Sequence, residues 1–532
     1  MAEAVTEQKT KGFLGWVERT GNRLPDPVFI FFYLIILLIG ISVVADLVNV
    51  SALHPTQLNA DGTPKVEEAV SLLSAANIQR LWVDMPKTFT HFHPLGYVLV
   101  VMLGAGVAER SGLFASSIRG AVRGAPKVLL TPLVALVAML SNHAADAGYV
   151  VMIPLAAIVF ASAGRHPLAG IAAAFAGVSG GFSANIAPGQ LDALLFGITE
   201  TAYASSSIDA GWTMNIAGNW WFIVALMLIY LPVIWFVTDK IIEPRLGKWV
   251  PDADSDNQSY GDEDKPLTPE QKKGLRNAGL ALLAVCAFWA AMTFGPGTPL
   301  LADGPGTEGD PWYQKAGPFF KSLVGGFMVL FLAAGWAYGS AAGTIKNQKD
   351  LVAMMAEAMK DLGYYLVLAF AAAHFVAMFG WSNLGLISAV HGADAIQNSG
   401  LPLPIVLGLI VLFSALLNLF VGSASAKWAL MAPVLVPMLI LLGISPDGAT
   451  AAYRVGDGAT NIITPLMVYF PLILIFAQRW KKDFGLGSLT AMMIPYSIWL
   501  LISGVALMML WIFLGLPLGP GAPAQIAIPG AG

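Results

Sequence analysis

Charged residues, cysteine and enzymatic signature motifs are all scarce in this sequence. Asp, Glu, Lys and Arg make up 12% of its 532 residues, the net charge is -4, and there is a single cysteine, Cys286. One thiol excludes an internal disulfide and a cysteine-based metal cluster. The lack of a basic tract argues against nucleic acid as a partner. The sequence contains neither a Gly-x-x-x-x-Gly-Lys-Ser/Thr loop for ATP nor a zinc-binding His-Glu-x-x-His motif. We therefore expect neither an ATP-driven pump nor a zinc hydrolase.

Apolar residues, by contrast, make up 56% of the chain and fall in long runs. The run from Phe29 to Val48 has the roughly 20 residues that a helix needs to cross a bilayer, and similar runs recur. Lipid offers the backbone no hydrogen-bond partners, so such runs form helices, and weak period-two patterning argues against a β-barrel. About 25 mostly polar residues precede the first run without a cleavable signal. We predict an all-α polytopic membrane protein whose first span is retained.

We predict nine full transmembrane helices and two interrupted apolar stretches. The full spans cover residues 27–48, 92–112, 167–187, 216–238, 276–295, 317–341, 362–380, 461–478 and 490–515. The interrupted stretches, 126–162 and 401–443, each contain two half-length apolar segments separated by small and polar residues. If both are re-entrant hairpins, most of the 29 lysines and arginines lie on one side of the membrane, which the positive-inside rule makes cytoplasmic. That side holds the N-terminus (1–26) and a solvated connector (239–275), and a small apolar tail follows at 518–532.

The two hairpins share a pattern that indicates an inverted repeat. The first carries "LSNHAADAGYVVMIP" and is followed by "SANIAPGQLD", while the second carries "VGSASAKWALMAP" and is followed by "GATNIITPLM". We predict a first half at 27–238 and a second at 276–517, with helices broken near 180–192 and 454–465. In inverted repeats of this kind, substrate and ions bind near the midplane where the broken helices meet. The alternative is that the small residues only permit tight helix packing.

Five segments resemble the signature motifs of one known family. They are "SNHAADAG", "GGFSANIAPGQLDALLFG", "WSNLG", "GSASAKWALMAPVLVPML" and "YRVGDGATNIITPLMVYFPL". In this order they are similar to segments of the AbgT family of p-aminobenzoyl-glutamate transporters, within the ion transporter superfamily. The resemblance covers nearly the whole chain and implies a homodimer, two re-entrant hairpins per subunit and secondary transport. Members are described as importers of p-aminobenzoyl-glutamate and as exporters of sulfonamide antimetabolites. The resemblance implies transport roles for Asp192, Ser425, Trp428, Pro446, Arg454, Asp457 and Pro465, and it suggests a sodium site at Asn418 and Asp457.

Lys427 lies in the middle of an otherwise apolar segment, Phe420 to Leu439. A lipid-facing lysine at mid-bilayer costs roughly 3 kcal/mol or more, so we expect Lys427 at the tip of the second hairpin. There Lys427 or Trp428 could contact substrate, since an indole stacking on an aminobenzoyl ring adds about 0.5–1.5 kcal/mol beyond burial. Alternatively, Lys427 snorkels to the interface and Trp428 anchors among lipid headgroups.

Arg454 and Asp457 are one helical turn apart, just before the apolar run that begins at Asn461. They could form a surface ion pair worth under about 1 kcal/mol. Their place at a predicted helix break favours a binding site instead. A carboxylate with broken-helix carbonyls suits sodium, and a partly buried carboxylate alone suits a proton. Arg454 would then hold an anionic substrate through two parallel hydrogen bonds.

The first half offers a second set of polar candidates at its hairpin tip and broken helix. They are Ser141, Asn142, His143, Asp146, Asn185 and Asp192, with Asn461 as the counterpart of Asn185 in the second half. Asp192 is either an exposed loop carboxylate or a coupling or gating residue. His143 and Asp146 could relay protons, or His143 could simply bind backbone carbonyls. This tip lacks the Ser-Asn-Thr sequence common elsewhere in the superfamily.

Together these features predict a secondary active transporter and not an enzyme. We expect it to carry small anionic aromatic molecules, p-aminobenzoyl-glutamate-like folate catabolites or sulfonamide antimetabolites, across the bacterial cytoplasmic (inner) membrane by an elevator-like movement. The coupling ion would be a proton or sodium, and no other cofactor is expected. A channel or facilitator for small organic anions is the alternative, since re-entrant hairpins also build pores. The string "GVSGG" (177–181) matches a nucleophile motif, but it lies in an apolar segment without the strand-to-helix turn that a nucleophile requires.

Overall fold

The computed structural model describes residues 26–527 apart from positions 60, 62, 123–125, 127–128, 145–147, 250–265, 303–314, 465 and 468. Predictions that rest on Asp146, on Pro465 or on the terminal residues 1–25 and 528–532 lie outside the described residues. The described chain is mostly helical and contains a two-stranded antiparallel sheet of β1 (Ser51–Leu58) and β2 (Pro64–Glu68).

The described α-helices range in length from four to 28 residues. In chain order they are α2 (Pro27–Leu47), α3 (Ala75–Val83), α4 (Met85–Thr90), α5 (His93–Arg110), α6 (Leu113–Val122), α7 (Leu130–Leu140), α8 (Ile153–Ser162), α9 (Pro167–Phe175), α10 (Gln190–Ser205), α11 (Trp220–Phe236), α12 (Glu243–Leu246), α13 (Pro269–Phe294), α15 (Gly317–Ala342), α16 (Gln348–Asp361), α17 (Gly363–Trp381), α18 (Leu384–Asn398), α19 (Leu403–Asn418), α20 (Ala424–Leu441), α21 (Pro446–Asn461), α22 (Phe470–Gln478) and α23 (Leu486–Phe513). Short 3-10 or π segments adjoin some of them: η2 (Ser141–Ala144), η3 (Gly148–Met152), η4 (Ala176–Gly180) and η5 (Val237–Ile242).

Seven helices of the described chain are long and apolar enough to cross a membrane. They are α2, α11 with its continuation to Leu246, α13, α15, α17, α20 and α23. An eighth crossing would join α5 to α6, which are bent by 61° relative to each other. Six of the seven correspond to predicted spans. The seventh, α20, occupies part of the second predicted hairpin.

Two of the predicted full spans, 167–187 and 461–478, are not continuous helices. The break predicted near 180–192 lies between Gly180 and Gln190, whereas the break predicted near 454–465 comes only after Asn461. The first span is helical only to Gly180, and the chain becomes helical again in α10. The second span begins where α21 ends, and only the nine-residue α22 falls within it. Each predicted span therefore covers one helix of a pair that a break interrupts. The first span covers α9 of the pair α9–α10, and the second covers α22 of the pair α21–α22. The partner helices α10 and α21 escaped the search for apolar runs because glycines and polar residues interrupt their apolar content.

The second predicted hairpin also differs from expectation. Its second arm, α20, is a continuous helix of 18 residues and not a half-length segment. The hydroxyl of Ser423 caps this helix by accepting a hydrogen bond from the Ala426 backbone N–H at 3.3 Å. Lys427 consequently lies in the first turn of α20, just after the turn of the hairpin.

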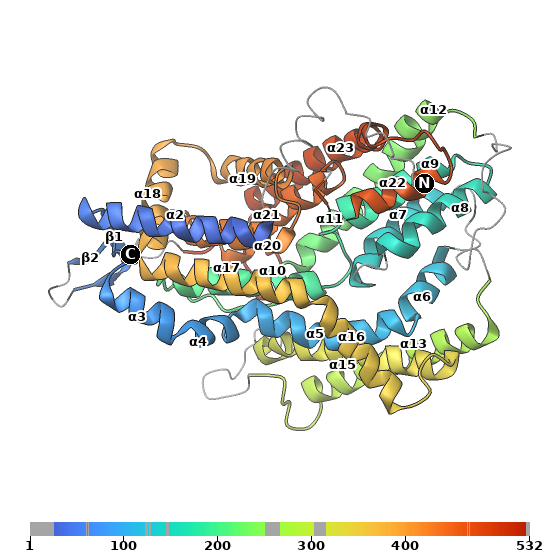
Figure 1. The fold of residues 1–532 in the computed structure, drawn as a ribbon, viewed down its shortest axis with the longest axis horizontal. Coiled ribbons are helices and arrows are strands. Elements are labelled where there is room, and N and C mark those ends of the chain that lie inside the picture. The colour runs from blue at the N-terminus through green and yellow to red at the C-terminus, as the bar shows by residue number, and fades with distance from the viewer. Residues whose placement is uncertain are drawn as a thin grey trace, which may run out of the picture.

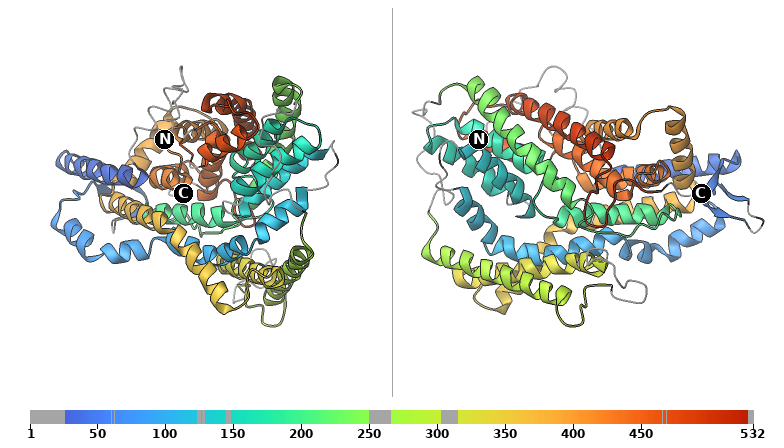
Figure 2. Two further views of the ribbon diagram at one scale, coloured as in Figure 1. Left: turned by 45° about the vertical axis from the view of Figure 1, so that its right-hand side comes forward. Right: turned by 180° about the vertical axis from the view of Figure 1, so that it is seen from behind.

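The helix α21 lies at the centre of the molecule. All 16 of its residues are buried, and it packs against α19, α20, α23 and α10. Close packing depends on its glycines: a Cβ atom at Gly456 would lie 2.2 Å from the carbonyl oxygen of Val411, and one at Gly458 would lie 2.9 Å from that of Gly180. In Figure 1, α13 and α15 form a separate layer beside α5 along one edge. Figure 2 shows α11 and α23 side by side on the opposite face.

Candidate functional site

The central helix α21 carries several of the predicted site residues. Its start is defined locally, because the Ser445 hydroxyl accepts a hydrogen bond from the Gly448 N–H at 3.1 Å and Pro446 occupies the first helical position. Arg454 and Asp457 follow on the same helix, and both are buried. A surface ion pair between these two is therefore wrong. Buried charges need partners, and each of the two finds its partner on another helix.

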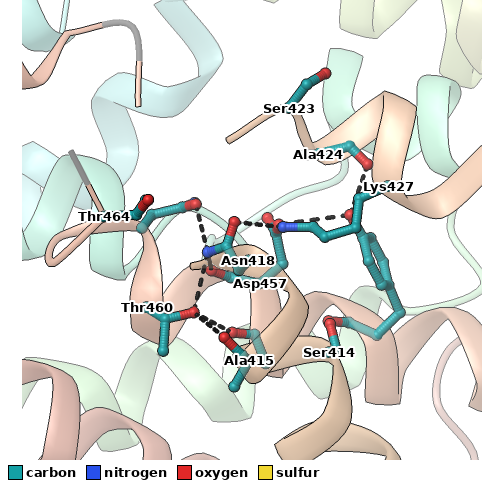
Figure 3. A network of polar contacts seen from close by, with 12 residues as sticks. Ser414, Ala415, Asn418, Ser423, Ala424, Lys427, Asp457, Thr460 and Thr464 are labelled. Atoms are coloured by element: carbon teal, nitrogen blue, oxygen red, sulfur yellow. Dashed lines mark hydrogen bonds and ion pairs between the residues drawn. The ribbon is translucent and has the colours of Figure 1, made fainter. Parts of the chain in front are cut away.

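Asp457 is paired with Lys427 at the second hairpin, as Figure 3 shows. The Lys427 ammonium donates hydrogen bonds to the side-chain oxygens of Asn418 and Asp457. The two charged side chains are 0% and 3% exposed. Snorkelling of Lys427 to the interface is thus wrong, because its charge is neutralised inside the protein.

Asn418 is held in place by its amide nitrogen. This nitrogen donates to the backbone oxygen of Asp457 at 2.7 Å, to the Thr460 hydroxyl at 3.0 Å and to the Asn461 side-chain oxygen at 2.8 Å. The amide oxygen of Asn418 therefore faces Lys427. In this arrangement Asn418 and Asp457 do not fit a sodium ion, because the lysine ammonium already occupies the position between their oxygens.

Arg454 is paired with Asp192 of the first half. Its Nη1 lies 2.7 Å from Asp192 Oδ1, and the side chains are 2% and 5% exposed. Asp192 stands in the first turn of α10, and its other oxygen accepts a hydrogen bond from the Gly189 backbone N–H at 2.8 Å. An exposed loop carboxylate at Asp192 is thus wrong. The Nε of Arg454 is buried and has no hydrogen-bond partner among the described residues.

Trp428 is buried between the two halves and does not lie at the membrane surface. Its indole N–H donates to the Thr199 hydroxyl of α10 at 2.9 Å, and its ring stacks on Tyr453 with centroids 4.6 Å apart. An anchor among lipid headgroups is therefore wrong. In this conformation Tyr453 covers the indole, so a ligand ring could stack there only after a rearrangement.

The tip of the first hairpin contacts the break between η4 and α10. The amide nitrogens of Asn142 and Asn185 both donate to the Met139 carbonyl, at 3.0 and 3.3 Å. His143 Nε2 lies 3.3 Å from the Pro188 carbonyl oxygen. Its predicted partner Asp146 is outside the described part of the chain. The Ser141 hydroxyl donates to the Ala138 carbonyl within the hairpin.

The remaining candidates lie at the second hairpin and the second break. Ser425 is partly buried, with its hydroxyl 3.4 Å from that of Ser423. Asn461 ends α21 and accepts the hydrogen bond from Asn418. The predicted site residues thus gather around α21, but in two separate clusters, one on Lys427 and one on Arg454.

A cavity of about 270 Å³ lies beside the Arg454 cluster. It is lined by residues of the first hairpin, the first break, α5, α10 and α21. Its lining residues are Val98, Met102, Asn142, His143, Tyr149, Phe182, Asn185, Ala187, Gly189, Gln190, Leu191, Asp192, Leu194 and Arg454. Ser425, Trp428 and Asp457 do not line it. Sequence reasoning missed the aromatic walls, Tyr149 and Phe182, although both fall within motifs that it quoted.

The chain matches the sequence profile of the AbgT transporter family over residues 12–526. The chain belongs to the AbgT transporter family. It is 36% identical over 522 residues to the p-aminobenzoyl-glutamate transport protein of Escherichia coli K12, covering 98% of both chains.

Two solved AbgT-family structures resemble it closely. The YdaH transporter of Alcanivorax borkumensis superposes with a TM-score of 0.84 at 40% identity, covering 93% of this chain and 100% of that one. MtrF of Neisseria gonorrhoeae, described as illuminating a class of antimetabolite efflux pumps, superposes with a TM-score of 0.87 at 42% identity, covering 96% and 100%. The predicted family and its helical membrane fold are thereby confirmed. This AbgT protein is a multi-span membrane transporter and not an enzyme.

Proposed function

We propose that this AbgT protein carries small anionic aromatic molecules across the bacterial cytoplasmic membrane as a secondary active transporter. The substrate class is that of p-aminobenzoyl-glutamate and of sulfonamide antimetabolites, as the printed descriptions of its relatives suggest. A proton or sodium gradient would drive the movement.

One observation supports this function above the others: a buried arginine lines a cavity with aromatic walls. Arg454 uses Nη1 for Asp192, while its Nε has no partner among the residues that the structure describes. A guanidinium offers five N–H donors in a planar fork that matches a carboxylate. A substrate carboxylate could therefore bind Arg454 beside Asp192 or in its place.

The rest of the cavity suits an aromatic ring. Tyr149 and Phe182 contribute to its walls, and Val98 and Met102 add apolar surface from α5. Tyr149 is held by stacking on Tyr469, with centroids 4.4 Å apart and planes 12° apart. The volume of about 270 Å³ is just below the roughly 300–1,000 Å³ typical of small-molecule pockets. We infer that the cavity holds a substrate of that size or a large part of it.

The position of the cavity suits an elevator-like movement. Its walls come from α5 on one side and from the first hairpin and broken helices on the other. We propose that α5 with α13 and α15 forms a fixed scaffold in a homodimer, and that the hairpin and broken-helix unit moves against it. The N-terminus would lie in the cytoplasm. The matching contacts of each hairpin tip with its own broken helix support an inverted repeat as the basis of this unit.

The test is counterflow in proteoliposomes. Vesicles loaded with unlabelled p-aminobenzoyl-glutamate or a sulfonamide should take up the labelled compound without a net gradient, and imposed sodium or pH gradients should drive net uptake. A channel would conduct without counterflow. A transport rate that does not change when either ion gradient is imposed would contradict secondary coupling.

A further inference from the structure

Two of the three buried carboxylates around α21 are paired with cationic side chains of the chain. Lys427 pairs with Asp457, and Arg454 pairs with Asp192. The third carboxylate is that of Asp447 in the first turn of α21. It accepts a hydrogen bond from the indole N–H of Trp212 at 2.8 Å. The positive charge beside the Asp457 carboxylate therefore comes from a residue of the chain, Lys427.

The oxygens around the Lys427 ammonium are arranged as ligands of a cation. Three acceptors fix the amide nitrogen of Asn418, so that its oxygen must point toward the ammonium. Asp457 contributes a carboxylate oxygen from α21. The ring of Tyr453 lies below, with its centroid 5.9 Å from the ammonium nitrogen. A carboxylate, an amide oxygen and an aromatic face are all groups that attract a cation.

We propose that the Lys427 ammonium is the resident cation of the Asn418–Asp457 site and takes the place of a free sodium ion. The site offers one negative charge. A sodium ion next to the ammonium would bring two positive charges to that single carboxylate in a water-poor interior, where like charges repel strongly. The ammonium is also tethered through α20, so it occupies the site without the loss of translational freedom that a free ion would suffer.

A tethered cation has a structural consequence that a free ion lacks. Asn418 ends the first arm of the second hairpin, Lys427 begins the second arm, and Asp457 belongs to α21. The ammonium therefore joins both arms to the central helix. The hairpin tip and α21 would remain together whatever the sodium concentration.

Thermal unfolding of the purified full-length protein in detergent tests this proposal. Tm is measured in NaCl, KCl and choline chloride at equal ionic strength. The wild-type protein should show the same Tm in all three salts. Lys427→Met, which keeps the apolar stem of the side chain but removes the ammonium, should have a lower Tm in choline and recover in a saturable way with sodium. Adding Asp457→Asn should abolish that recovery. Lys360→Met, at an exposed lysine of α16, should behave as wild type.

Two results would overturn the proposal. The first is a saturable, sodium-specific rise in the wild-type Tm that Asn418→Ala removes, since sodium would then share the site with the lysine. The second is a folded Lys427→Met protein that does not respond to sodium. If that variant does not fold, the comparison of wild type with Asn418→Ala still decides the question. Neither measurement involves substrate or flux, so the outcome does not depend on the proposed function.

Discussion

Neutralising Asp192 should destabilise the protein far more than its single hydrogen bond to Arg454 implies. Asp192→Asn keeps an oxygen that can accept the Gly189 N–H, but it removes the charge that Arg454 faces. Breaking a buried ion pair by removing one partner typically costs about 3–5 kcal/mol, because the other charge is left uncompensated. The two side chains are 2% and 5% exposed. The free-energy cost of breaking a buried ion pair therefore applies here, and not the smaller cost for a surface pair.

A double-mutant cycle measures this effect. The free energy of unfolding in mixed micelles is compared for the wild type, Asp192→Asn, Arg454→Met and the double variant. Each single variant should lose about 3–5 kcal/mol, whereas the double variant should lose clearly less than the sum, because neither charge is left alone. Single losses below about 1 kcal/mol, as for solvent-exposed pairs, would refute the reasoning.

Three further predictions concern other parts of the structure. Tyr149→Leu should raise KM for an aromatic substrate about twofold to tenfold, since it removes a ring interaction of about 0.5–1.5 kcal/mol, and initial transport rates would show this. Gly458→Ala should cost about 1–3 kcal/mol of stability because its Cβ would meet the Gly180 carbonyl at 2.9 Å, while Gly363→Ala, with nothing within 4 Å, should be tolerated in the same unfolding assay. Burial lowers the pKa of His166 below 6.5, and its ring accepts a hydrogen bond from the Leu168 N–H. The unfolded chain therefore binds more protons at this residue than the folded protein does. The free energy of unfolding should consequently fall as the pH drops below about 6.5. A pH series with His166→Asn, which can still cap the helix, should lack this loss.

The long helices could be predicted from the sequence because lipid imposes one condition on all of them. Spans such as 27–48 and 317–341 correspond to α2 and α15 since about 20 apolar residues in lipid must form a helix. The same rule failed for α21. That helix is shielded by protein on every side, so it needs no apolar surface, and its glycines and polar residues serve packing and pairing.

The site was predictable in its members but not in its pairings. Motif resemblance and polar breaks pointed to Arg454, Asp457, Asp192 and Lys427. The spacing of Arg454 and Asp457 placed them together on one helix, yet their partners come from α10 and α20, which are remote in sequence. Which charges meet is decided by the tertiary packing of broken helices, and no local pattern in a single sequence records it.

Equilibrium binding of p-aminobenzoyl-glutamate to the purified protein tests the central claim most directly. Isothermal titration should give saturable binding to the wild type, a large loss of affinity for Arg454→Ala, and unchanged affinity for Arg479→Ala, whose arginine is exposed on the surface. Wild-type affinity in the Arg454→Ala protein would contradict the assignment of this cavity as the substrate site.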